Sequence, residues 1–130
     1  MRVTAHVSGA APVELAWERY AEPARWATWA PQIRSVDVGA DRIAPGVTGT
    51  VHALFGISVP FEITEVDEAN RTWSWTVHPR PVTMRLEHTV EPWGDGGSRT
   101  GIVVHGPLPV VLSYAPLARI ALHRLVAAEP

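Results

Sequence analysis

The stretch "RTWSWTVHPRPVTMRLEHTV", residues 71–90, contains two runs of alternating side chains separated by the loop "HPRP". In the first run, Trp73, Trp75 and Val77 alternate with small hydroxyl-bearing residues. In the second run, the apolar phase is occupied by Met84, Leu86, His88 and Val90. Successive side chains of a strand point to opposite faces of its sheet. The pattern therefore predicts two antiparallel strands with one polar and one apolar face.

Similar runs lie on both sides of this stretch, between turn-rich segments. They are "RVTAHVS" (2–8), "IRSVDV" (33–38), "GVTGTVHALF" (46–55) and "PFEITEV" (60–66) before it, and "RTGIVVH" (99–105) after it. From residue 33 onward the spacing is even and no helical segment intervenes, which favours an antiparallel meander of strands. The sequence thus predicts seven strands in all. We expect their apolar face to include Val51, Ala53, Phe55, Phe61 and Ile63.

Two short helices are predicted between the first and second strands. In "PVELAWERYAE" (12–22), apolar residues recur with helical spacing, and Pro12 suits the first helical position. In "PARWATWAPQ" (23–32), Pro23 and Pro31 bound a second short helix that carries Trp26 and Trp29. The two helices are therefore expected to meet at a tight corner.

The last segment, "LPVVLSYAPLARIALHRLVAAE" (108–129), predicts a helix that is interrupted or begins near Pro116. It is apolar over most of its circumference, so it must be largely buried. The predicted fold class is α+β, with one antiparallel sheet packed on helices. A chain of 130 residues is expected to form a single domain, residues 1–130.

This last helix is rich in alanine, so its small side chains are expected to leave part of the apolar sheet face uncovered. Two outcomes are open: the sheet collapses onto the helix, or a cavity remains that an apolar small molecule can fill. In the second case Trp26 and Trp29 close the open end of the cavity. In the first case they are ordinary core aromatics.

Composition excludes several classes of function. The net charge is -2, and the 11 basic residues are arginines scattered along the chain, which makes nucleic acids and membrane surfaces poor partners. The chain has no cysteine, so disulfides and thiolate chemistry are excluded. The first residues lack a signal-peptide pattern, and no segment is long and apolar enough to span a bilayer. We expect a cytoplasmic protein without membrane insertion.

Four segments resemble the START-like or SRPBCC superfamily, in particular its bacterial polyketide cyclase/dehydrase-type members. They are "EPARWATWAPQIRSV" (22–36), "GVTGTV" (46–51), "PFEITEVDEANRTWSW" (60–75) and "SRTGIVVHGPL" (98–108). The order of the predicted elements is also similar, and the resemblance extends over residues 2–128. These motifs characterise the fold of the superfamily more than any one activity.

The resemblance implies a helix-grip fold, as in the birch-pollen allergen, in which a seven-stranded antiparallel sheet wraps around a C-terminal helix. Two small helices would close one end of a hydrophobic tunnel. Members of the superfamily bind lipids, sterols, quinones, plant hormones or polyketide chains, and some catalyse ring closure or dehydration. Three functions therefore stay open: a cyclase or dehydratase, a non-catalytic lipid or quinone carrier or sensor, and a protein-interaction module.

His88 is the candidate catalytic residue, because a histidine in the apolar phase of a strand can act as a general acid or base. The alternative is a core histidine bonded to a neighbouring group. The predicted ligand-binding residues are Trp26, Trp29, Phe55, Phe61, Trp73, Trp75, Met84, Leu86, His105 and Tyr114. We predict no metal site and no cofactor, since the sequence has neither cysteine nor paired histidines or carboxylates at helical spacing. The partner expected is a hydrophobic small molecule, and the sequence does not indicate an oligomeric state.

Overall fold

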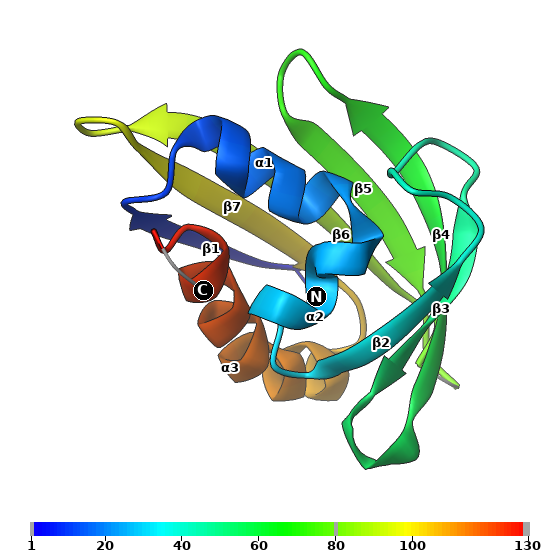
Figure 1. Cartoon of the computed structure of the whole chain (residues 1–130). Coiled ribbons are helices and arrows are strands. Elements are labelled where there is room, and N and C mark those ends of the chain that lie inside the picture. Colours follow the sequence, from blue (N-terminus) through cyan, green and yellow to red (C-terminus); the bar gives the residue numbers. More distant parts are fainter. Residues whose placement is uncertain (1, 80, 129–130) are drawn as a thin grey trace.

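The computed structural model describes residues 2–79 and 81–128, without the side chains of residues 108 and 110–114. In this part of the chain, seven strands form one antiparallel sheet in the order β1-β7-β6-β5-β4-β3-β2 (Figure 1). The strands are β1 (Arg2–Gly9), β2 (Ile33–Val38), β3 (Thr48–Ala53), β4 (Ser58–Asp67), β5 (Thr72–Val77), β6 (Met84–Trp93) and β7 (Gly97–His105). The predicted α+β fold class and seven antiparallel strands are confirmed, and strands β2 to β7 form the predicted meander, with β1 added beside β7.

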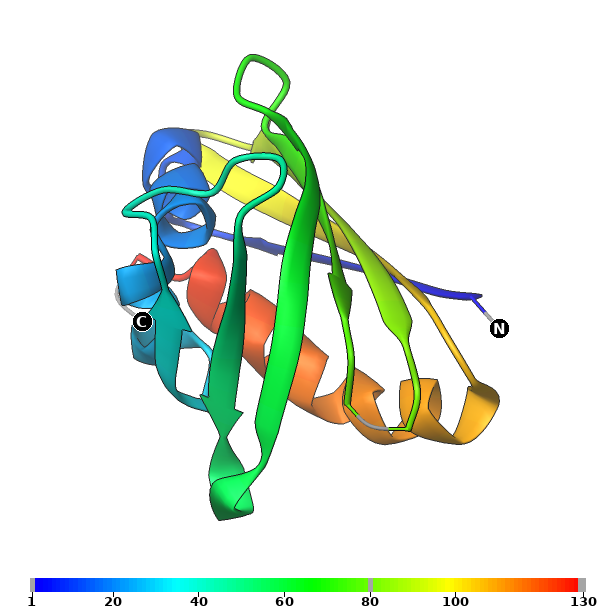
Figure 2. The same ribbon diagram turned by 90° about the vertical axis from the view of Figure 1, so that its right-hand side faces the viewer.

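The strands β5 and β6 pair antiparallel, as the alternation in residues 71–90 predicts. Trp73 pairs with His88 and Trp75 pairs with Leu86 in the register of the two strands. The apolar phase of both strands is buried. The sheet curves around the final helix, so this buried face is the concave one (Figure 2).

The corner between β1 and β2 consists of the helix α1 (Val13–Ala21), the 3₁₀ turn η1 (Pro23–Arg25) and the helix α2 (Trp26–Trp29). Pro12 lies one position before the first helical residue instead of occupying it. The indole N–H of Trp26 donates to the carbonyl of Tyr20 at 2.8 Å, and that of Trp29 donates to the carbonyl of Arg19 at 2.9 Å. These two bonds hold α2 against the end of α1.

The final helix, α3 (Leu108–Leu125), continues through Pro116. The prediction of an interruption or a start at this proline was wrong. Proline removes one backbone hydrogen bond and its ring crowds the preceding turn. Pro116 is exposed, so this defect lies on the solvent side of the helix, where water can hydrate the freed carbonyl.

Phe55 was expected on the buried face of β3, and this expectation was also wrong. The strand ends at Ala53, and the chain turns through η2 (Leu54–Gly56). Phe55 occupies the left-handed backbone region of that turn, with φ 63°, and its side chain is 92% exposed. The alternation that places residues on faces therefore stops two residues before Phe55.

The C-terminal end of α3 is held firmly by its neighbours. The buried guanidinium of Arg19 donates from Nη1 to the carbonyls of Leu125 at 2.6 Å and Ala127 at 2.7 Å. Backbone carbonyls at a helix end have no partner within the helix, so these bonds act as a cap. The strand β1 passes so close that a Cβ on Gly9 would lie 2.3 Å from the carbonyl oxygen of Val126. The C-terminal end of α3, the end of β1 and α1 therefore form one packed unit.

Candidate ligand-binding site

A group of ring side chains fills the end of the concave face that α1 and α2 cover. We call it the aromatic cluster; its members are Tyr20, Trp26, Trp29, Phe61, Trp73, Trp75 and His88, all of them buried. Trp26 stacks on Trp73 with ring centroids 5.9 Å apart and meets Trp75 edge-on at 5.1 Å. Tyr20 meets Trp29 and Trp73 edge-on as well. Edge-to-face and offset contacts are the preferred geometries of aromatic pairs.

Trp26 and Trp29 are therefore core residues, with only 1% and 7% of their surfaces exposed. Both residues also line the small space that the aromatic cluster leaves unfilled. Their burial agrees with the alternative in which the two tryptophans are ordinary core aromatics, and neither of them lines the larger groove described below. At this end the sheet has collapsed onto the helices, and the tryptophans enclose a small residual cavity.

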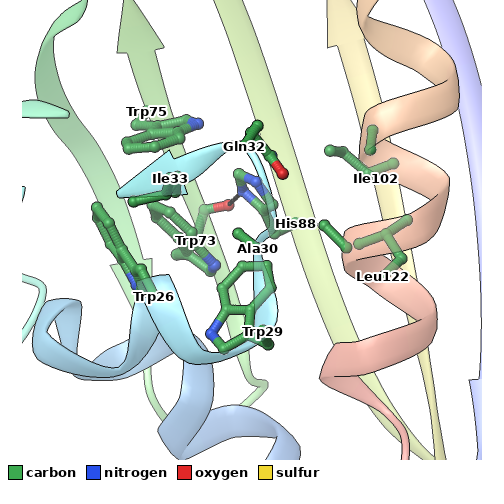
Figure 3. A pocket seen from close by; sticks show the side chains of 12 residues that line it. Trp26, Trp29, Ala30, Gln32, Ile33, Trp73, Trp75, His88, Ile102 and Leu122 are labelled. Carbon is green, nitrogen blue, oxygen red and sulfur yellow. Dashed lines mark hydrogen bonds between the residues drawn. The ribbon is translucent and has the colours of Figure 1, made fainter. Parts of the chain in front are cut away.

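We call this space the inner cavity, and Figure 3 shows the side chains that line it. Its volume is about 30 Å³. Its lining is Trp26, Trp29, Ala30, Gln32, Ile33, Trp73, Trp75, His88, Ile102, Ala118, Ala121 and Leu122. A cavity needs about 10 to 15 Å³ of space accessible to water to hold one water molecule, and a cavity of about 150 Å³ accommodates benzene. The inner cavity can therefore hold a small polar group and no ring.

A larger space, the outer groove, continues along the concave face towards the hairpin of β3 and β4. Its volume is about 200 Å³. Its lining is Gln32, Ile33, Val51, Ala53, Val59, Trp75, Val77, Pro79, Met84, Leu86 and Leu117. Gln32, Ile33 and Trp75 line both spaces, so the inner cavity lies next to the outer groove.

His88 faces the concave side, as its place in the alternation predicts. Its Nδ1 lies 3.2 Å from the carbonyl oxygen of Trp73, and its ring stacks on the indole of Trp73 at 4.1 Å. A carbonyl oxygen only accepts, so Nδ1 carries the proton and donates, and Nε2 is the unprotonated nitrogen. Burial lowers the pKa of His88 to about 3, because the charged imidazolium is desolvated there. The ring is therefore neutral at pH 7.

The remaining predicted site residues other than His105 divide into four groups. Met84 and Leu86 line the outer groove, while Phe61 packs behind Trp26 and Trp75 and lines neither space. Phe55 points into solvent. Tyr114 is among the residues whose side chains lie outside the described part of the structure.

His105, also expected in the cavity, belongs to the outer face of the sheet. It pairs with Arg85 across β6 and β7, and its Nε2 lies 3.2 Å from a carboxylate oxygen of Glu87. The hydrogen bond with His105 is the largest cause that lowers the pKa of the Glu87 carboxyl. The strand that carries His105, β7, is apolar on both faces near this residue, so the sequence pattern could not assign His105 to one face of the sheet.

Several lining residues were missed by the sequence analysis, notably Gln32 and Leu117. Gln32 lies between Pro31 and the first residue of β2, where no periodic pattern assigns a direction. Leu117 follows Pro116 on a helix whose other lining residues are mostly alanines. For Gln32, the one available signal was its place directly after the corner that carries Trp26 and Trp29.

In residues 2–79 and 81–128, no three His, Asp or Glu side chains come together as a metal-binding group. Within the same part of the chain, no helix is long and apolar enough to cross a membrane.

Residues 1–129 match the family model described as polyketide cyclase / dehydrase and lipid transport. The chain belongs to this family. The START-like resemblance of the sequence is thereby confirmed. No curated protein matches the chain in a sequence search.

Solved structures similar to this polyketide cyclase/dehydrase family member share its fold at low sequence identity. A protein from Nitrosospira multiformis has a TM-score of 0.75 and 16% identity, with 97% of each chain covered. The di-domain ARO/CYC BexL of the BE-7585A biosynthetic pathway has a TM-score of 0.80 and 17% identity, over 97% of this chain and 45% of BexL. Ara h 8.0201 has a TM-score of 0.70 and 16% identity, over 96% of this chain and 97% of its own. These matches show the helix-grip fold.

Proposed function

We propose that this family member binds a hydrophobic small molecule, lipid- or polyketide-like, with the apolar body of the ligand in the outer groove. The observation that carries the proposal is the lining of this groove, in which ten of the eleven residues are apolar and Gln32 is the exception. Ligand sites are typically concave and mostly apolar, with a few polar groups that orient the ligand. The family description, which names cyclases and lipid transport, agrees with such a ligand.

The size of the groove limits the ligand. An apolar cavity of about 150 Å³ accommodates benzene, and most ligand pockets enclose roughly 300 to 1,000 Å³. The 200 Å³ of the outer groove therefore suits one or two rings or a short length of chain. Any longer ligand would extend past Leu117, which is 38% exposed at the edge of the groove.

Binding without chemistry is the mode that the electrostatics favour. His88 is the one titratable residue among the described residues that line the two spaces. Because its pKa is lowered to about 3, it holds no transferable proton near pH 7 and is a weak base. A carrier or sensor needs neither a proton donor nor a strong base.

Cyclisation or dehydration is the second candidate. The observation that favours it is the position of His88 at the inner end of the apolar groove, where an unprotonated Nε2 could accept a proton from a bound substrate. Such an enzyme would gain most of its rate from holding a flexible chain in a folded geometry. Loss of turnover with retained binding in His88→Gln would support this candidate over the carrier.

The binding proposal is tested by extracting apolar compounds from the purified protein and by titrating it with the neutral, two-ring fluorescent probe naphthalene. The decisive variant is Ala53→Phe, which fills the groove from its half-buried wall. The matched control is Thr48→Phe, an exposed position on the same strand. We expect the wild type and the control to bind the probe saturably and Ala53→Phe to bind at least about tenfold more weakly. Equal binding by all three proteins would contradict the proposal.

A further inference from the structure

Polar atoms without partners mark the inner end of the site. The indole nitrogens of Trp73 and Trp75 and the side-chain carbonyl oxygen of Gln32 are buried, and none has a hydrogen-bond partner among the described residues. All three residues line the inner cavity. Figure 3 shows the indole nitrogen of Trp75 on the side of the ring that faces Gln32. Buried polar groups in folded proteins are nearly always paired, so three orphans around one cavity require an explanation.

The chemistry of two of these atoms, the indole nitrogen of Trp75 and the amide oxygen of Gln32, defines a group that satisfies both. An indole N–H can only donate a hydrogen bond, and an amide oxygen can only accept one. A partner that serves both must accept and donate through the same small atom. Water and a hydroxyl group meet this condition, whereas a carbonyl, an ether or a carboxylate cannot donate.

The geometry connects this group to the outer groove. The inner cavity, at about 30 Å³, has room for one oxygen with its hydrogen. It shares Gln32, Ile33 and Trp75 with the apolar groove, so a molecule in the groove can extend one end into it.

The electrostatics exclude an anionic end. Of the described residues that line the cavity and the groove, none is an arginine or a lysine. A buried carboxylate without a cationic partner is strongly disfavoured. His88 supplies no positive charge, because its ring is held neutral with Nδ1 donating to the carbonyl of Trp73.

We infer that the site selects uncharged molecules that end in a hydroxyl group, such as a phenol or an alcohol, and that this hydroxyl enters the inner cavity between Trp75 and Gln32. The inference rests on the proposed binding function and names the ligand class of the same site. The hydroxyl oxygen accepts from the indole N–H of Trp75 and its hydrogen is donated to Gln32. It displaces one water molecule.

The test compares four probes of one shape at pH 7 by equilibrium dialysis: 2-naphthol, naphthalene, 2-methoxynaphthalene and 2-naphthoate. We expect 2-naphthol to bind roughly tenfold more tightly than the other three, the effect of one or two hydrogen bonds. In Trp75→Phe and in Gln32→Leu the advantage should fall below about threefold. Trp93→Phe, at an exposed tryptophan remote from the groove lining, is the control and should keep the full advantage. Circular dichroism and melting temperatures verify that the variants are folded.

The outcomes separate this inference from the binding proposal. If all four probes bind equally well, or 2-naphthoate binds most tightly, the proposed function stands and the hydroxyl preference is refuted. If none of the probes binds to the wild type, both fail. A crystal structure with 2-naphthol in the groove and an undisplaced water in the inner cavity would also refute the inference.

Discussion

The two ends of the concave face are built differently. At one end the aromatic cluster, α1, α2 and the capped end of α3 leave room for a single water-sized group. At the other end the groove between the central strands and the middle of α3 is open and apolar. Large rings from three elements fill the interior at the packed end, whereas at the open end α3 contributes one described lining residue, Leu117, and the interior stays unfilled.

The largest effect is expected from Trp26→Ala, which removes the largest fully buried side chain among the described residues. Truncating a buried tryptophan costs about 3 to 5 kcal/mol, and the carbonyl of Tyr20 also loses its donor. We expect the free energy of unfolding in urea to fall by about 4 kcal/mol. Leu117→Ala, at the open end, should cost less than about 1 kcal/mol. Similar losses in the two variants would remove the distinction between the ends.

The acid sensitivity of the packed end is the next test. Between pH 6.5, the ordinary value, and the lowered pKa of about 3, the unfolded chain binds a proton at His88 that the folded chain excludes. The free energy of unfolding should therefore fall as the pH falls through this window, by on the order of 3 kcal/mol between pH 6.5 and 4. His88→Gln should lose this contribution. His6→Gln, at an exposed position on β1, is the control and should keep the wild-type pH profile.

Arg19→Met measures the cap on α3. The variant keeps much of the buried stem and leaves the carbonyls of Leu125 and Ala127 without their donor, so we expect a loss of about 2 kcal/mol in urea unfolding. Amide exchange should become faster in the last turn of α3. Arg124→Met, on an exposed position of the same helix, should change neither quantity. If amide exchange in the last turn of α3 were unchanged in Arg19→Met, packing alone would hold the C-terminal end of this helix.

The smallest effect is expected at η2, the turn that joins β3 and β4. Asparagine tolerates the left-handed backbone region better than phenylalanine does, so Phe55→Asn should raise the free energy of unfolding by about 0.5 to 1 kcal/mol. Binding of naphthalene should be unchanged, because Phe55 does not line the groove. Weaker binding in this variant would show that the binding site reaches the turn η2, which contradicts the groove lining described above.

The sheet and its faces could be predicted from the sequence, because alternation in residues 71–90 is a local property. Trp73, Trp75 and His88 face inwards as the pattern predicts. The division of the interior into a filled end and an open end could not be predicted, since it depends on how rings from α2, β4 and β5 interlock. Phe55 and His105 show two further limits: a strand that ends early, and a strand that is apolar on both faces.

The helix α3 combines a fixed end with an internal proline. Arg19 and the close approach of Gly9 immobilise its last turns, while Pro116 removes a backbone hydrogen bond one residue before Leu117, the helix residue that lines the groove. A helix bends most easily where such a bond is missing. Bending of α3 at Pro116 would therefore widen or narrow the outer groove beside Leu117 and leave the tryptophans in place.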